Sequence, residues 1–421
     1  MNKQSSSQEF IITPFTHSYG GDSLGRLPDG RAVFTPFAMP GEKIRIRLVE
    51  EKRGHARAEL LEVLEPAADR TSPICPHFRE CGGCHYQHMT YPAQLAAKTE
   101  ILKDQLIRLG GLKNPEIKAI VSSPQQSFYR NHVQFHLTPQ GELGYHRSDH
   151  AGIIPIRECY LPEPTLNELW PRLSFEPGLE IERVALRCGV DEDIQMILES
   201  SDITPPDFLI EDLPISAVHL GPAGPFVLAG SNTIFFQVLD KIFQVSAGSF
   251  FQVNTAMAGA MVRHLLDVIP QFQPLGPQTT LLDVYSGVGL FSAFFADKVG
   301  RIIAIESSPI ATEDYVVNLD AYDSIELYEA TAEAVLPSLD VKPDIVLVDP
   351  PRSGIDRRAL DALVQLNPTL IVYISCDPAT LARDVKRLLT AGYQLAQVTP
   401  FDMFPQTFHI ETVVLLSRVA K

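Results

Sequence analysis

Hydrophobic and polar residues alternate in the N-terminal part of the chain. In the stretch KIRIRLV, Ile44, Ile46 and Leu48 alternate with basic residues, which is the period-two pattern of a half-buried β-strand. Glycine and proline turns recur in the preceding stretch YGGDSLGRLPDGRAVF. Several short strands in so short a segment predict a small barrel of the OB type over residues 1–67, with a generic small β-domain as the alternative.

The spacing of apolar residues becomes helical after the cysteine-rich stretch that follows the barrel. Apolar residues at helical spacing in YPAQLAAKTEILKDQLIRLG predict a helix over 91–109, ahead of Gly110 and Gly111. Residues 126–245 are rich in short apolar runs such as HVQFHLT and IQMILES. We therefore predict a strand-rich central domain over 68–245, with its helix packed on the domain that follows.

From about residue 255, apolar strands alternate with helical stretches. The strands are TLLDVYS, RIIAIES, DIVLVDPP, TLIVYISC and TVVLLSRV, and most end in polar or glycine-bearing loops. This alternation predicts a doubly wound, Rossmann-like α/β domain over 246–421. The expected fold class is therefore α/β, with an N-terminal barrel and a strand-rich middle.

Composition limits the classes of function. The 421 residues allow two or three domains, and 45% hydrophobic residues are typical of a soluble globular protein. The polar start and the lack of a long apolar run predict neither a signal peptide nor a membrane span. Six cysteines do not suggest a disulfide framework, so we expect a reducing, cytoplasmic setting.

Charge argues against bulk nucleic-acid binding, because the net charge is −16. The acidity is uneven, however, since nine Lys and Arg balance nine acids within residues 1–67. Six basic residues within 43–57 face only two acids there, Glu50 and Glu51. Lys43, Arg45 and Arg47 are therefore candidate RNA contacts, the alternative being an ordinary solvated strand face.

A glycine-bearing turn follows the first α/β strand, in LLDVYSGVGLF. Gly287 and Gly289 allow a ligand to approach the backbone closely, and Ser292 stands where a dinucleotide fingerprint has its third glycine. Glu306 ends the next strand, where a carboxylate can accept both hydroxyls of a ribose. The pattern favours an adenosine cofactor, NAD or S-adenosylmethionine, over a turn without a ligand.

Two later strands deliver reactive groups to the same edge of the predicted sheet. Asp349 opens the D-P-P turn that is typical of many methyltransferases acting on planar amines or bases, although Pro-Pro also ends strands without function. Cys376 stands just before a predicted helix, whose dipole favours a thiolate, and this makes it a candidate nucleophile. His409 and Glu411 precede the last strand on the same edge.

Three cysteines stand close together in CPHFRECGGC. Cys75, Cys81 and Cys84 need a fourth ligand to complete a metal site. Cys188 lies in an apolar run and is expected in the core, whereas Cys159 lies in a loop flanked by charge and proline. Zinc or a [4Fe–4S] cluster suits four thiolates, and the spacing favours the cluster because zinc sites usually pair two C-x2-C units.

Taken in order, these stretches resemble the RNA uracil-5 methyltransferase family over nearly the whole chain. Each motif is weak alone, but the ordered set is specific: a TRAM-type barrel at about 10–67, CPHFRECGGCHYQH, YRNHVQFH, FFQVN, LLDVYSGVG, VDPPRSG, SCDPATLARD and FPQTFHIE. The resemblance implies methyl transfer from S-adenosylmethionine to C5 of a uridine in RNA. It also implies a [4Fe–4S] cluster with Cys159 as its fourth ligand.

The resemblance assigns roles to individual residues. Cys376 would add to uracil C6, and Glu411 would remove the C5 proton. Leu290 departs from the family, which often has a polar residue there, and Ser286 replaces a frequent cysteine. The cofactor would lie against Gln252, Tyr285, Glu306 and Asp349.

The RNA substrate is expected to present an unstacked uridine, because C6 is reached only when the base leaves its stack. Arg130 joins the basic strand as a candidate backbone contact. The barrel and cysteines are typical of bacterial family members that modify 23S rRNA, although archaeal tRNA enzymes carry them too. We expect a monomer.

Other classes of protein stay open at this point. They are an amine methyltransferase, which Arg352 after Pro-Pro disfavours, a non-catalytic RNA-binding protein and, least favoured, a dehydrogenase.

Overall fold

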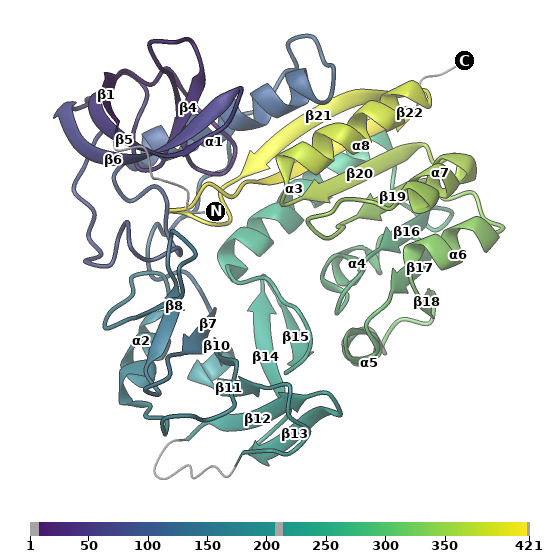
Figure 1. Ribbon diagram of the computed structural model, residues 1–421. Coiled ribbons are helices and arrows are strands. Elements are labelled where there is room, and N and C mark those ends of the chain that lie inside the picture. The colour runs from purple at the N-terminus through teal and green to yellow at the C-terminus, as the bar shows by residue number, and fades with distance from the viewer. Residues whose placement is uncertain (1–7, 207–213, 419–421) are drawn as a thin grey trace.

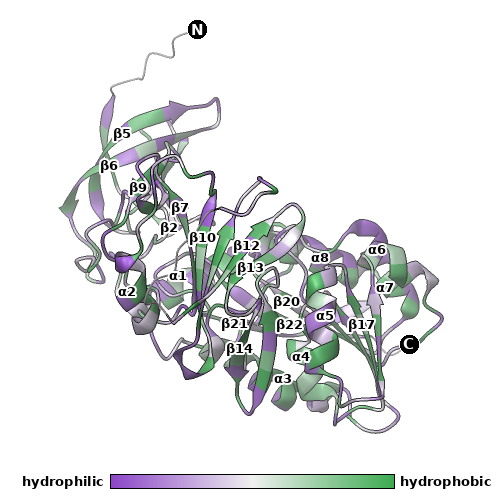
Figure 2. Cartoon of the chain, turned by 90° about the horizontal axis from the view of Figure 1, so that it is seen from below, coloured by the Kyte–Doolittle hydropathy of each residue, from purple (hydrophilic) through white to green (hydrophobic). Residues whose placement is uncertain are grey.

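The computed structural model describes residues 8–206 and 214–418, and the ends of the predicted first and last domains, 1–7 and 419–421, lie outside it (Figure 1). The N-terminal strands form one sheet in the order β1-β5-β6-β4-β3-β2. They are β1 (Glu9–Ile12), β2 (Thr16–His17), β3 (Ser23–Arg26), β4 (Ala32–Thr35), β5 (Lys43–Glu51) and β6 (His55–Glu65). The predicted alternation is confirmed: Ile44, Ile46 and Leu48 are buried in the barrel core, and Figure 2 shows bands of alternating hydropathy along β5 and β6.

Helix α1 (Tyr91–Arg108) follows the cysteine segment and matches the predicted helix. Pro92 stands in its first turn, where its missing N–H is tolerated. Ile101, Leu102 and Leu106 belong to the core on one face of the C-terminal sheet, and α1 packs against α8 (Pro378–Thr390). The helix therefore connects the cysteine segment directly to the C-terminal sheet.

The middle of the chain forms a mixed seven-stranded sheet in the order β13-β12-β11-β10-β7-β8-β9. Its strands are β7 (His132–Leu137), β8 (Leu143–His146), β9 (Ile153–Pro155), β10 (Arg183–Cys188), β11 (Ile194–Glu199), β12 (Ser216–Gly221) and β13 (Gly224–Ala229). Helix α2 (Pro164–Leu169) packs against β10. A hairpin of β14 (Thr233–Val238) and β15 (Lys241–Ser246) then leads to the C-terminal sheet.

The C-terminal sheet has the order β18-β17-β16-β19-β20-β22-β21, and only β22 runs against its neighbours. Its strands are β16 (Thr280–Val284), β17 (Arg301–Glu306), β18 (Ile325–Glu329), β19 (Ile345–Val348), β20 (Leu370–Ser375), β21 (Tyr393–Phe401) and β22 (Glu411–Arg418). The sheet confirms the predicted doubly wound α/β class.

Helices cover both faces of this sheet (Figure 1). Successive strand residues point to opposite faces, so Leu281 joins the core with α3 (Thr255–Phe272) while Leu282 joins the core with α1 and α8. The other helices are α4 (Leu290–Phe295), α5 (Pro309–Asn318), α6 (Ala332–Val335) and α7 (Arg357–Leu366). Both faces are therefore buried, which leaves the carboxyl edge of the sheet for a site.

Candidate active site

The carboxyl edge of the C-terminal sheet opens into a cavity of about 1120 Å³. Segments far apart in the sequence bring seven of the predicted site residues into its wall. These are Gln252, Tyr285, Gly287, Glu306, Asp349, Cys376 and Glu411. Leu290 and Ser286, the two departures from the family pattern, also line this cavity.

The two glycines of the turn after β16 have different surroundings. Gly287 has φ +54°, and a Cβ added there meets nothing within 4 Å, so its backbone faces open space. Gly289 does not line the cavity; it has φ +91°, and an added Cβ would lie 2.2 Å from Leu319 Cδ1. Tyr285 also has a positive φ, 65°, which is unusual for an aromatic residue and marks a constrained loop. Gly287 is therefore suited to a ligand and Gly289 to packing.

Glu306 is fixed at the end of β17 by backbone donors. Its Oε2 accepts from Gly287 N at 2.9 Å, and its Oε1 accepts from Ser307 N at 2.7 Å and from Ser308 N at 2.8 Å. The carboxylate is thus held rigidly in the cavity wall, and three of its roughly four acceptor sites are filled, so about one site on Oε2 is left for a ligand's hydroxyl.

Buried carboxyl groups cluster at the inner end of the cavity. Burial, and then the charge of Asp283, raise the pKa of Asp349 to about 7. Burial, and then the charge of Asp349, raise the pKa of Glu411 well above its usual range, while Arg352 opposes this shift. A cation placed beside Asp349 would offset this repulsion, so the cluster favours a positively charged ligand.

The structure corrects the expected state of Cys376. The sequence predicted a thiolate favoured by the helix that follows, but burial and the charges of Glu411 and Asp349 raise the pKa of this thiol to about 12. The prediction was wrong because the folded chain buries the thiol and brings two carboxyl groups to it from other strands, and burial followed by these charges raises its pKa. The charge of Arg352, which also lines the cavity, acts in the opposite direction and lowers the pKa of the thiol.

Asp377 connects the candidate nucleophile to two other parts of the molecule. Its Oδ1 accepts from Ala379 N at 2.9 Å and from Thr380 N at 2.8 Å, which caps α8. The hydroxyl of Tyr19, from the barrel, donates to Oδ2 of the same carboxylate. The barrel therefore contacts the residue next to Cys376.

Sequence reasoning missed some residues of the cavity wall. Arg352, Phe250 and Phe404 line it, and His409, which was predicted at this edge, lines it too. Phe250 is 71% exposed and lines a second cavity as well. Nothing in FFQVN distinguishes Phe250 from its buried neighbour Phe251, because only the folded chain shows which ring is exposed.

The second cavity, of about 450 Å³, is lined by all four predicted cysteine ligands, Cys75, Cys81, Cys84 and Cys159. Burial raises the pKa of every one of these thiols, to about 11 for Cys81 and about 12 for Cys84. Cys188 lies in the core of the central sheet, as predicted. Within the described ranges, no group of three or more His, Cys, Asp or Glu could hold a single metal ion as it stands.

The predicted RNA contacts lie in two separate places, one on the barrel and one at the cysteine cavity. Lys43, Arg45 and Arg47 lie on the outer face of β5, where each is ion-paired with glutamates of the barrel. Arg130 lines the cysteine cavity, where its guanidinium lies 5.9 Å from the centre of the Phe404 ring. Contact of these four residues with RNA stays a prediction.

The sheet order, the glycine turn and the cavity at the carboxyl edge define a Rossmann-like methyltransferase fold. Residues 233–419 match the family model described as tRNA (Uracil-5-)-methyltransferase, and residues 5–61 match the TRAM domain. The chain belongs to the RNA uracil-5 methyltransferase family.

Similarity to known proteins extends over the full chain. An uncharacterized RNA methyltransferase of Thermosynechococcus vestitus is 33% identical over 99% of both chains, and one of Aquifex aeolicus is 33% identical over 94% of this chain and 96% of its own. The crystal structure of Pyrococcus abyssi tRNA (uracil-54, C5)-methyltransferase in complex with S-adenosyl-L-homocysteine is also similar. It shares 26% identity and a TM-score of 0.75 over 96% of this chain and 99% of that one.

No helix in the described part of the chain is both long and apolar enough to cross a bilayer.

Proposed function

We propose that this protein transfers a methyl group from S-adenosylmethionine to C5 of a uridine in RNA. The observation that carries the proposal is the meeting of Cys376, Asp349 and Glu411 in one cavity beside the turn at Gly287. A thiol supplies a nucleophile, a second group supplies a base, and the turn supplies room for the cofactor.

The cofactor fits the residues that are present. Gly287 offers open backbone, Glu306 offers a fixed carboxylate for a ribose hydroxyl, and the hydroxyl of Ser286 is buried without a hydrogen-bond partner. Asp349 would lie near the positive charge, and Gln252 and Tyr285 would complete the wall. When bound, S-adenosylmethionine supplies the electrophilic methyl group.

In the proposed mechanism, Cys376 is the nucleophile and Glu411 is the base. The thiol of Cys376 loses its proton to solvent, and its Sγ forms a bond to uracil C6. The electron pair of the C5–C6 double bond makes C5 an enolate carbon, which would take the methyl group as the bond between that group and the cofactor sulfur breaks. Glu411 then removes the C5 proton, the C5–C6 double bond forms again, and the bond from Sγ to C6 breaks. Cys376 leaves as a thiolate and regains a proton from solvent, and the carboxyl group of Glu411 releases the C5 proton to solvent before the next cycle.

RNA is the substrate class, and we propose 23S rRNA within it. The TRAM match and the cysteine segment support this choice, because the resemblance associates both with rRNA enzymes among bacteria. tRNA is the second candidate, because the full-length architecture is shared with a tRNA enzyme of Pyrococcus abyssi. We propose that Phe250, exposed at the mouth of the cavity, stacks on a base of the RNA.

One experiment tests both the proposed activity and the proposed RNA substrate. The protein is incubated with methyl-labelled cofactor and with rRNA or tRNA from cells lacking its gene, and the nucleosides are mapped by mass spectrometry. We expect label in 5-methyluridine at a defined position of 23S rRNA. Label in tRNA alone would correct the substrate, and label in neither RNA would overturn the proposed activity.

We propose that the four-cysteine cavity holds a [4Fe–4S] cluster. All four thiols line one cavity, and the cysteine spacing favours a cluster because zinc sites usually pair two C-x2-C units. The cluster would supply iron that keeps the four sulfurs as thiolates against their raised pKa values. The sulfurs would in turn join the cysteine segment to the central sheet.

Cys159→Ser should remove the absorbance of the cluster near 400 nm and lower thermal stability, because one of four ligands is lost. Iron and sulfide analysis of anaerobically purified protein measures the loss. Cys188→Ser is the matched control, since that thiol lies in the central core, and its cluster content should stay unchanged. A full cluster in Cys159→Ser would refute this ligand set.

A further inference from the structure

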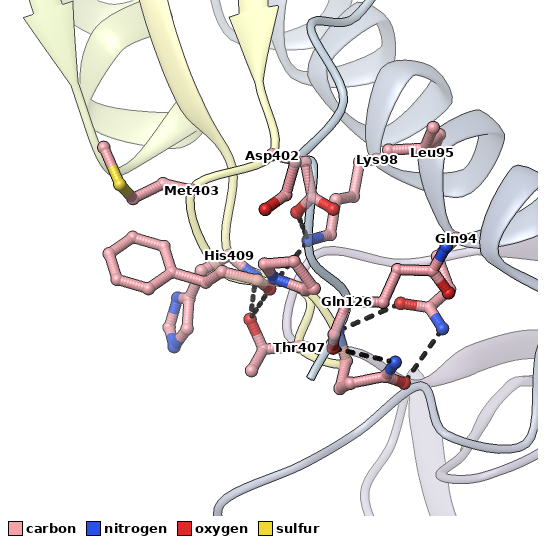
Figure 3. Close-up of polar contacts among 12 residues, drawn as sticks. Gln94, Leu95, Lys98, Gln126, Asp402, Met403, Thr407 and His409 are labelled. Atoms are coloured by element: carbon pink, nitrogen blue, oxygen red, sulfur yellow. Dashed lines mark hydrogen bonds and ion pairs between the residues drawn. The ribbon is translucent and has the colours of Figure 1, made fainter. Parts of the chain in front are cut away.

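A polar cluster, fully buried at its ion pair and partly buried at Gln406, joins the loop between β21 and β22 to helix α1 (Figure 3). We call this cluster, Gln94, Lys98, Asp402 and Gln406, the α1 latch. Lys98 Nζ lies 2.5 Å from Asp402 Oδ1 and donates to the carbonyl of Phe404 at 3.0 Å. The side chains of Lys98 and Asp402 have no exposed surface.

The second half of the latch is a pair of glutamines. Gln94 Nε2 donates to Gln406 Oε1 at 3.0 Å, and Gln406 N donates to Gln94 Oε1 at 3.0 Å. The carbonyl of Gln406 accepts from the backbone N–H groups of His85 and Tyr86, at 2.8 and 3.0 Å. These two residues directly follow Cys84, so the loop is fastened to the cysteine segment as well as to the helix.

The latched loop leads straight into the catalytic edge. Phe404 and His409 lie in the cavity wall, and the loop ends at Glu411, the first residue of β22. Gln406 has φ +69°, so the loop turns through a left-handed residue that is not glycine. The contacts of the latch hold this conformation.

Stability alone does not account for a latch of this kind. A buried ion pair must repay the desolvation of two charges, and a well-packed apolar pair of similar volume is often as stable or more so. The hydrogen bonds of charged and amide groups instead fix the orientation of the loop, because each bond forms only over a narrow range of distances and angles. A geometric role is therefore the better explanation for a fully buried lysine facing a loop of the active site.

We propose that Gln94 and Lys98 are positioning residues for the general base. The latch holds the 402–410 loop so that Glu411 enters the cavity within reach of the C5 proton, and the backbone of the cysteine segment completes the fastening at Gln406. This inference rests on the proposed function, since it assigns a role within that reaction. It also assigns a role to the cysteine segment, whose backbone hydrogen bonds to Gln406 help to position the general base.

The variants are chosen to separate the effect on the position of Glu411 from the effect on the stability of the folded protein. Lys98→Met leaves Asp402 buried without its partner, so both stability and turnover should fall. The double variant Lys98→Met/Asp402→Leu removes both charges and should regain most of the lost stability. We expect its kcat to stay about 100-fold below that of the unaltered protein, because the base is misplaced, with little change in KM. Lys103→Met, on the exposed part of the same helix, is the matched control.

RNA containing 5-fluorouridine supplies the decisive measurement. Its C5 carries fluorine in place of the proton, so the covalent adduct with Cys376 forms but cannot be released by a base. We expect the double variant to form this adduct at nearly the normal rate while it turns over natural RNA slowly. Gln94→Met, which buries no unpaired charge, carries the same test should the double variant fail to fold.

Each outcome decides the question. Turnover that returns with stability in the double variant, or adduct formation that falls as far as turnover does, would overturn the positioning role. Unaltered protein that makes neither 5-methyluridine nor the 5-fluorouridine adduct would instead overturn the proposed function.

Discussion

Replacing Cys376 with alanine should reduce methyl transfer by about 10⁴-fold or more, because the reaction then lacks the group that makes C5 nucleophilic. The thiol is only partly buried in the cavity wall, so the change should cost little stability. Initial rates with labelled cofactor and RNA measure the loss, and calorimetry checks that the cofactor still binds. Cys188→Ala is the control for removing a thiol elsewhere. Full activity in Cys376→Ala would exclude covalent catalysis.

The reactivity of the same thiol should depend steeply on pH. With a pKa raised to about 12, Cys376 is protonated in the free protein throughout the neutral range. Because the thiolate is the reactive form, alkylation by iodoacetamide should accelerate about tenfold per pH unit between pH 7 and pH 9. Mass spectrometry of the peptide containing Cys376 follows the reaction. A rate that levels off below pH 8 would show that the thiol ionises as easily as the sequence alone predicted.

The parallel sheet could be predicted from the sequence because its strands are buried on both faces. Such strands are continuous apolar runs, and the polar residue after each run falls at the carboxyl edge. Glu306, Asp349 and Cys376 were located in this way, and all three line the cavity. The gathering of four cysteines could also be predicted, because a three-thiol cluster requires a fourth and Cys159 lies in a loop.

The electrostatics of the site could not be predicted in the same way. The pKa of Cys376 depends on the burial of its thiol and then on Glu411 and Asp349, which reach it from other strands. The local sequence shows only the start of a helix. The α1 latch could not be predicted for the same reason, because its residues come from separate segments of the chain. Lys98 looks like an ordinary polar position of an amphipathic helix until the loop at Asp402 covers it.

Glu411→Gln should stop the reaction after methyl transfer, with the RNA still joined to Cys376. The amide has the size of the carboxyl group but cannot accept the C5 proton, so the bond from Sγ to C6 cannot break. Stability should change little, because glutamine has nearly the same size and shape as the buried carboxyl side chain that it replaces. We expect turnover to fall by about 10²–10⁴-fold, as for removal of a general base.

The trapped species can be observed directly. On a denaturing gel, natural uridine RNA should migrate with Glu411→Gln as a covalent complex, and its mass should include the transferred methyl group. Glu163→Gln is the control, because burial also raises the pKa of that carboxyl group but it lies outside the cavity. Its turnover should be normal and leave no complex. If Glu411→Gln releases product at the unaltered rate, another group removes the C5 proton; if it forms no adduct, Glu411 acts before or during the attack of Cys376 on C6.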